Sequence, residues 1–455
     1  MNSFKNINSI KYTLWLLFFL FNILNVKAQQ EVTHLTLEKC LDYGLENNYK
    51  VVKSQYDKQE KTFATKEAKS KVQPQVSASG QFDNYMKLET SIMPGEFFGQ
   101  PGEQVFVNFG TTYNYTLSGT LSQVIFDPSI FTDIKVARNV EELSAIKSKM
   151  TKEETVYNIC IVYYDLLKSG EELDKIHELL SQKDTSLMIT QKQVELGVTH
   201  EIELNRAKVD RSMLEVSERN LQATISQQMN YLKVLIGMPV ENDISVDKAP
   251  LTFIEVPEAF MSDSINIGSI TTIQQLEVER EQLLLKKKGY QLQYLPTLSA
   301  NITGAYQYQS DNFELSTKNS WSDYAYIGFK LSIPLYDGLA KQSKINQVNM
   351  QLSSLRKDLE HEKQVTYNNY FNAINQLLSA YQSTISQQEN AQLAEKVYAQ
   401  TKALYHQGKM TYVELLSSEA AVREAQFTYI AEIIKYKKAK LELKKVKGEL
   451  LSLAG

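Results

Sequence analysis

Two short segments carry the side chains whose types and spacing could do chemistry. In "VELGVTHEIELNRA", Gly197 is followed five, six and seven positions later by a branched apolar residue, Glu203 and a leucine. In "LYHQGKMTYVELLSS", Gly408 precedes Glu414 by the same spacing. A carboxylate that faces a narrow aqueous opening concentrates cations and repels anions. From the residues alone, however, an ordinary solvated helix carboxylate is the favoured interpretation of Glu414.

Enzyme and metal-site patterns are not found in the sequence. The histidines have no HExxH or paired ligand spacing, and no GxSxG turn, Walker-type loop or dinucleotide fingerprint occurs. We therefore predict a protein that is not an enzyme and uses no cofactor or metal. His200 and His406 flank the two glycines and could tune a contact with pH, but they are favoured as surface bystanders.

The two glycines end long helical patterns. From about Asp127 to Leu196, and again after Gly338, apolar residues recur every three or four positions, which is typical of a coiled coil. About 70 helical residues would make a rod on the order of 100 Å. Glycine pays no Cβ penalty in the left-handed conformation that ends many helices. Gly197 and Gly408 are thus predicted to be the tips of helical hairpins, rather than glycines inside continuous helices.

Sequence landmarks occur twice in the same order. "VQPQVSASG" corresponds to "YLPTLSANITG", and "LSQVIFDPSIF" to "LSIPLYDGLAK", before each tip glycine. We predict two structural repeats, 29–237 and 265–455, each with a helix, a β-hairpin, a long helix, a turn and a helix. Residues 238–264 hold three prolines and are predicted to be a linker or equatorial segment.

The amino terminus predicts export. Residues 1–28 have a basic start, about eleven apolar residues and a small-x-small end, as a secretory signal does. The apolar run is too short for a membrane anchor. The net charge of −4 gives no pull toward nucleic acid. Cys40 and Cys160 are favoured as small buried hydrophobes over a disulfide, although both remain open.

Period-two alternation predicts β-hairpins at about 74–127 and 295–336. Each has one apolar, aromatic face and one hydroxyl-rich face, and its strands are long enough to cross a bilayer when tilted. The connections, such as the one beginning at Ser91, resemble outer loops of membrane barrels. Hairpins in a soluble β-domain would fit the alternation equally well.

Membrane strands imply assembly. Four strands cannot close a barrel in lipid, where open edges find no hydrogen bonds. Two copies would give eight strands with a filled interior, and three would give twelve with room for passage. The pattern alone leaves both possibilities open.

The mature chain resembles the TolC-like outer-membrane efflux proteins. The resemblance rests on "LTLEKCLDYGLENNYKV", "YLPTLSANITG" and "LKVLIGMP", with their order, spacing and duplication. It implies a mixed α/β fold: a homotrimer with a twelve-stranded barrel in the outer membrane, continued by an α-helical coiled-coil barrel in the periplasm. It also implies a passive exit channel for small molecules or polypeptides, driven by an inner-membrane pump through a periplasmic adaptor. The alternative from a different class is a secreted coiled-coil scaffold.

The resemblance also implies roles for residues at the tips. Adaptor docking would fall on Leu196, Gly197, Val198, Gln407, Gly408 and Lys409. A periplasmic aperture would be formed by Tyr405, Glu414, Ser417 and Glu203. Two departures from the family pattern matter: Ser417 stands where a second acid is common, and Met410 where a cation can link the closed gate.

Overall fold

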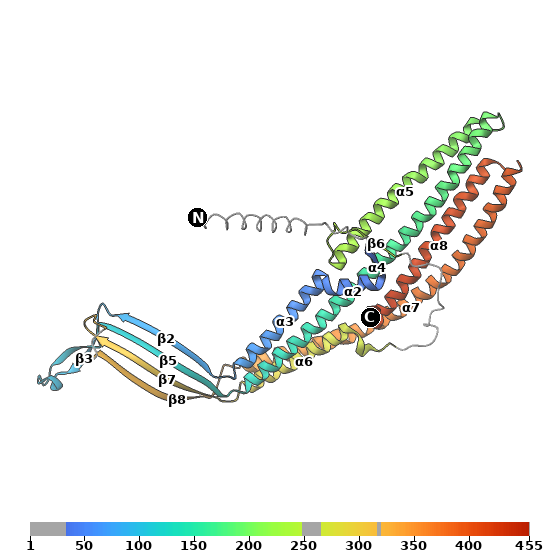
Figure 1. Cartoon of the computed structure of the whole chain (residues 1–455). Coiled ribbons are helices and arrows are strands. Elements are labelled where there is room, and N and C mark those ends of the chain that lie inside the picture. Colours follow the sequence, from blue (N-terminus) through green and yellow to red (C-terminus); the bar gives the residue numbers. More distant parts are fainter. Residues whose placement is uncertain (1–32, 248–264, 316–319, 455) are drawn as a thin grey trace, which may run out of the picture. The chain divides into compact units, whose positions relative to one another are not determined.

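The computed structural model describes residues 33–247, 265–315 and 320–454. The predicted signal, 1–28, and the linker from 248 onward therefore lie outside the described residues. The chain divides into two compact units, shown within Figure 1. We call them the helical unit (described parts of 1–53, 150–270 and 365–455) and the sheet unit (54–149 and the described parts of 271–364). Each is described by itself.

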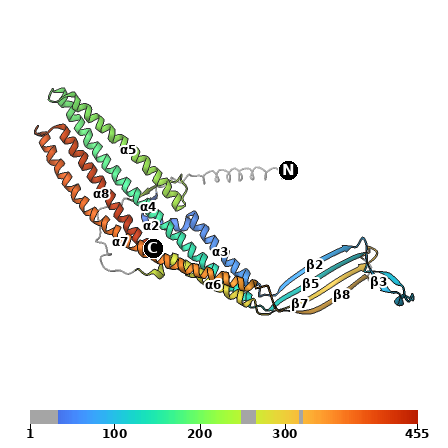
Figure 2. The same cartoon turned by 180° about the vertical axis from the view of Figure 1, so that it is seen from behind.

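Two helical hairpins dominate the helical unit. The carboxyl-terminal part of α4 (Pro128–Glu195) pairs with α5 (Glu201–Ile236), and that of α7 (Ala340–His406) pairs with α8 (Tyr412–Lys447), as Figures 1 and 2 both show. The unit also holds α2 (Leu37–Asn47), η3 (Ile267–Ser269) and η5 (Leu450–Leu453). Within the described residues, no helix combines the length and the apolar character that crossing a membrane requires.

Each hairpin turns at its predicted glycine. Gly197 and Gly408 both have φ of 72°, in the left-handed region. Around both, the two backbone N–H groups that end the helix donate to carbonyls of the last turn, as in a Schellman motif. The donor-to-acceptor pairs are Val198 to Gln193 (2.8 Å), Gly197 to Val194 (3.0 Å), Lys409 to Leu404 (2.9 Å) and Gly408 to Tyr405 (2.9 Å).

A hydrophobic core joins α2, α4, α5 and α8. Its fully buried members include Leu41, Ile159, Leu232 and Ile236. Cys40 and Cys160 are free and buried in this core, and burial raises the pKa of each thiol to about 12. Both cysteines thus behave as buried hydrophobes, as the sequence favoured.

The predicted linker begins with ordered structure. β6 (Ile244–Val246) pairs in parallel with β1 (Thr33–Leu35), so this part of the predicted linker or equatorial segment is an ordered strand. Two β-branched residues in β6 favour the extended conformation despite the neighbouring prolines.

The end of α5 gives a first testable prediction. Gly237 has φ of 77°, and a Cβ there would lie 2.2 Å from the Asn47 carbonyl oxygen. Gly237→Ala should therefore lower the free energy of unfolding by about 2–4 kcal/mol, through strain and overlap, measured as a drop in Tm of the purified protein. Gly170→Ala is the control: this helical glycine has open space around it, so alanine should stabilise slightly. Equal Tm values for both variants would contradict the prediction.

The sheet unit is built on an antiparallel sheet of order β2-β5-β7-β8. Its strands are β2 (Gln75–Asn84), β5 (Tyr113–Phe126), β7 (Thr297–Ser310) and β8 (Trp321–Ser332), and the neighbouring helices are α3 (Tyr49–Ser70, mostly in this unit) and α6 (Thr271–Leu292). Both predicted hairpins are present, and β5 joins them by pairing with β7. The outer edges of β2 and β8 have no neighbour within this sheet.

The segment after Ser91 differs from the prediction of a loop. It forms a further hairpin of β3 (Glu89–Pro94) and β4 (Gln104–Phe109), connected through η1 (Gly95–Phe98). Apolar cross-strand pairs, such as Ile92 with Phe106, favour the strands. Most of the glycine and proline residues lie in the turn between β3 and β4. In the sequence, these residues made the whole segment resemble a loop.

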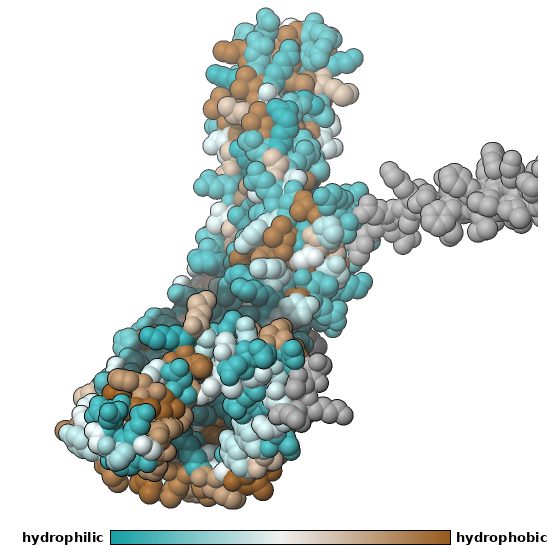
Figure 3. Space-filling model, turned by 90° about the vertical axis from the view of Figure 1, so that its left-hand side faces the viewer, coloured by the Kyte–Doolittle hydropathy of each residue, from teal (hydrophilic) through white to brown (hydrophobic). Residues whose placement is uncertain are grey.

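The four-stranded sheet has two different faces. Val76, Leu121, Ile302 and Ile327 form one cross-strand row on the apolar face, and Ile327 is 66% exposed. On the other face, hydroxyls bond across strands, as Ser79 does with Ser118 at 2.8 Å and Thr120 with Thr303 at 3.2 Å. Figure 3 shows hydrophobic side chains on the surface of the sheet unit, whereas polar colours dominate the helical unit.

The buried stripe of α7 partly differs from the predicted one. Ile345, Val348, Leu355 and Leu359 are buried as expected. Farther along, Ile374, Leu378, Tyr381 and Ile385 continue the apolar spacing in the sequence, but the buried residues lie one position earlier, at Ala373, Leu377, Ala380 and Thr384. The smaller side chains allow α8 to approach closely, and the Thr384 hydroxyl donates to the Glu432 carbonyl at 3.1 Å.

Candidate functional site at the hairpin tips

The predicted docking residues lie on or beside the two turns and are exposed: Leu196, Gly197, Val198, Gln407, Gly408 and Lys409. Leu196 and Val198 are 77% and 72% exposed. Apolar side chains this exposed beside a tight turn are a suitable contact for another protein. The second turn carries Gln407 and Lys409 at the corresponding positions, so the two tips differ in character.

Glu414 has a local structural task. Its carboxylate accepts hydrogen bonds from the Thr411 N–H (2.7 Å) and hydroxyl (2.9 Å), while the Thr411 hydroxyl accepts from the Glu414 N–H (3.3 Å). This reciprocal capping box starts α8. The bonds from the Thr411 backbone and side chain lower the pKa of Glu414. The exposed carboxylate is thus held in its charged form.

Glu203 lies in a different environment from Glu414. Its side chain is largely buried: Oε1 accepts a hydrogen bond from Arg206 at 2.9 Å, and Oε2 is buried without a hydrogen-bond partner. Burial, and then the charge of Glu203, raise the pKa of Tyr405. The Tyr405 ring packs against Tyr412 with centroids 6.0 Å apart.

The structure therefore brings some of the predicted aperture residues together and not others. Glu203 and Tyr405 lie between the hairpins, whereas Glu414 and Ser417 are on the exposed side of α8. Within one chain, the four do not form a single cluster.

Sequence reasoning missed a charged cluster farther from the tips. Lys183 of α4 contacts Asp210 of α5, and its Nζ lies 2.7 Å from Glu419 of α8. The Lys183 side chain is only 5% exposed. The signal was present: Lys183 continues the three- and four-residue spacing of the buried Ile176 and Leu179.

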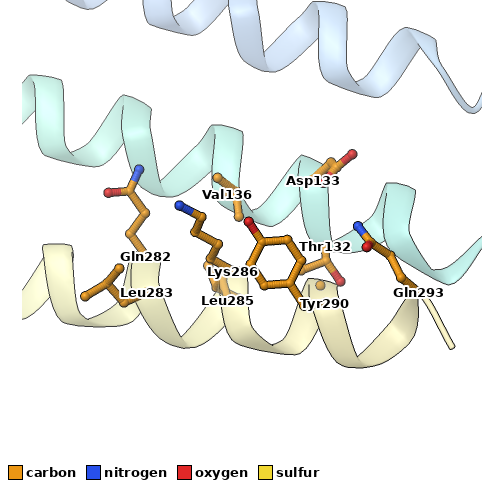
Figure 4. Close-up of a pocket in the computed structure, with 10 residues that line it drawn as sticks. Thr132, Asp133, Val136, Gln282, Leu283, Leu285, Lys286, Tyr290 and Gln293 are labelled. Atoms are coloured by element: carbon orange, nitrogen blue, oxygen red, sulfur yellow. The ribbon is translucent and has the colours of Figure 1, made fainter. Parts of the chain in front are cut away.

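Two open recesses lie away from the hairpin tips. In the sheet unit, one of about 390 Å³ lies between α4 and α6, where Lys286 and Tyr290 extend beside Thr132 and Val136 (Figure 4). In the helical unit, another of about 410 Å³ is lined by Tyr164 and by lysines of α8. Among the described residues, no group of three or more His, Cys, Asp or Glu side chains is arranged to hold a metal.

Comparisons agree with this architecture. Residues 272–449 match the family model described as outer membrane efflux protein. The fold is similar to that of the CmeC outer membrane channel of Campylobacter jejuni (TM-score 0.72, 15% identity, covering 91% of this chain and 85% of that one). It is also similar to that of VceC of Vibrio cholerae (TM-score 0.71, 14% identity, covering 90% of this chain and 96% of that one). A third similar structure is the MtrE outer membrane channel of Neisseria gonorrhoeae (TM-score 0.69, 14% identity, covering 91% of this chain and 89% of that one). No curated protein sequence matches the chain.

Residues 272–449 are thus similar to the outer membrane efflux proteins, and the fold of the chain is similar to that of outer membrane channels.

Proposed function

We propose that three copies of the chain form a passive exit channel of a tripartite system, and that the two sequence halves arose by duplication. One observation carries the channel proposal: a four-stranded sheet with an exposed apolar face and two unpaired outer edges. Such edges have no hydrogen-bond partners in lipid. Pairing β8 of one copy with β2 of the next would close twelve strands around the hydroxyl-rich face.

Extraction and conductance test this proposal. The protein should stay in the membrane fraction until detergent is added, crosslink as a trimer, and open water-filled pores in planar bilayers. A monomer in the soluble periplasmic fraction would instead support a secreted coiled-coil scaffold. A membrane-embedded trimer that conducts no ions would also refute the exit channel.

In this channel, Tyr405, Glu414, Ser417 and Glu203 line the periplasmic aperture. The exposed, charged Glu414 supplies one carboxylate per chain at the surface of α8, and the charge of Glu203 acts on Tyr405. A ring of such carboxylates in a narrow mouth favours cations. The role is electrostatic, and no catalytic step or cofactor is involved.

Glu414→Gln tests the aperture. Glutamine can occupy the same capping-box position, so α8 should start as before while the charge is lost. The cation-to-anion permeability ratio in single-channel recordings should fall several-fold toward one. Glu424→Gln, at an exposed position farther along α8, should leave the ratio unchanged. Wild-type selectivity in the Glu414 variant would remove Glu414 from the aperture.

Docking of the periplasmic adaptor falls on the turns, at Leu196, Gly197 and Val198 in one hairpin and Gln407, Gly408 and Lys409 in the other. Support comes from the exposure of these residues and from the rigid capping of both turns. The pump supplies the energy, and the channel supplies the path.

A further inference from the structure

The charged cluster links helices of both hairpins. Lys183 lies on α4 and Asp210 on α5 of the first hairpin, whereas Glu419 lies on α8 of the second. All three belong to the helical unit. The ammonium group therefore holds a carboxylate from its own hairpin and another from the neighbouring hairpin.

Each member occupies a position where the helix pattern calls for an apolar residue. Lys183 follows Leu179 by four positions, Asp210 follows Ala207 by three, and Glu419 follows Leu415 by four; the named predecessors are all buried. A polar residue at such a position costs stability and selects one register, because only one alignment pairs it.

The surroundings shield most of the cluster from water, although the Asp210 side chain is 25% exposed. Lys183 is 5% exposed and Glu419 15%, and the buried Ala207, Tyr412 and Leu415 pack together nearby. Burial, followed by the charges of Asp210 and Glu419, raises the pKa of Tyr412. The aromatic ring that packs against Tyr405 is thus also close to both carboxylates.

A second bridge between α4 and α8 has the opposite polarity. Asp165 of α4 lies 2.6 Å from Lys438 of α8. Sliding α8 by one helical turn, about 5 Å, would separate the partners of both bridges. This pair is about one-third exposed, so screening weakens it, and the buried cluster dominates.

We propose that Lys183 is a positioning residue that fixes the second hairpin against the first, so that both tips of a chain move as one rigid body. Two carboxylates without the ammonium would repel each other inside the protein and drive α5 and α8 apart. An adaptor would then meet the two turns at a fixed separation. This consequence for docking rests on the proposed function.

Distance measurement between the tips tests this directly. Spin labels at Leu196→Cys and Gln407→Cys, in a Cys40→Ala and Cys160→Ala background, report the separation in the detergent-solubilised full-length protein. Labelled chains are diluted with unlabelled ones, so that only pairs within a chain contribute. The parent should give one narrow distribution. Lys183→Met should give a broad distribution at longer distance, with the population outside the parent peak raised roughly tenfold.

Two further variants separate charge from packing. K183E combined with E419K keeps the same charges in exchanged places and should restore the narrow distribution. K183M combined with D210N and E419Q removes the repulsion between the carboxylates, so this triple variant should fold even if K183M does not. Its distance distribution should remain broad, because no ion pair tethers α8. A narrow distribution in K183M or in this triple variant would overturn the proposal. A broad distribution in the exchanged variant would overturn its electrostatic basis.

Adaptor capture by unlabelled protein distinguishes this inference from the docking proposal. Loss of capture in K183M with a broad distribution, and recovery in the exchanged variant, supports both. Full capture despite a broad distribution leaves the positioning role standing and refutes docking at a fixed separation.

Discussion

Replacing Gly408 with valine should abolish export while leaving the channel assembled in the outer membrane. Valine in the left-handed conformation costs about 1–3 kcal/mol. A Cβ at Gly408 would meet nothing within 4 Å, so the penalty is conformational and not a clash. The turn would relax to negative φ and lose the two bonds made by Lys409 and Gly408 to the last turn of α7.

The loss should remain local to the tip. A few kcal/mol is enough to rearrange an exposed turn, but the long helices and the sheet make their contacts elsewhere. Trimer yield and bilayer conductance should therefore match wild type, whereas export in a deletion strain and capture of the adaptor should fall at least tenfold. Gly408→Asn is the matched control, since asparagine tolerates the left-handed conformation. If valine and asparagine behave alike, the turn geometry is not what the adaptor recognises.

Placing a lysine at Ile327 should prevent stable insertion into the membrane. Ile327 is in the apolar row that crosses all four strands of the sheet. A lysine on a lipid-facing position of a barrel costs about 2–4 kcal/mol near the bilayer centre, and a trimer carries three. We expect Ile327→Lys to reduce trimer in the outer-membrane fraction by at least tenfold, measured by unheated gel electrophoresis of detergent extracts.

The adjacent residue provides the control. Tyr326 is on the opposite face of β8, where it pairs in register with Thr303 of β7. If that face lines a water-filled lumen, Tyr326→Lys should assemble normally and change only conductance. Equal loss for both variants would show that neither face is aqueous, and normal assembly of both would remove this sheet from the lipid.

Local patterns in the sequence determined much of this protein. The three- and four-residue spacing predicted α4 and α7, alternation predicted the four strands of the main sheet, and glycine chemistry predicted the turns at Gly197 and Gly408. These features depend on residues within one turn of helix or one strand of each other. Backbone sterics and side-chain direction are enough to set them.

Tertiary structure decided the rest. Lys183 and Glu419 are 236 positions apart, and no local rule states which helices will meet there. The same limit explains the stripe of α7, where close packing against α8 favours Ala373 over Ile374. It also explains why Glu203 lies between the hairpins while Glu414, at the matching position of the other hairpin, caps a helix in solvent. A side chain's neighbours across a coiled coil are chosen by burial and charge pairing over the whole unit, which the spacing within one helix does not contain.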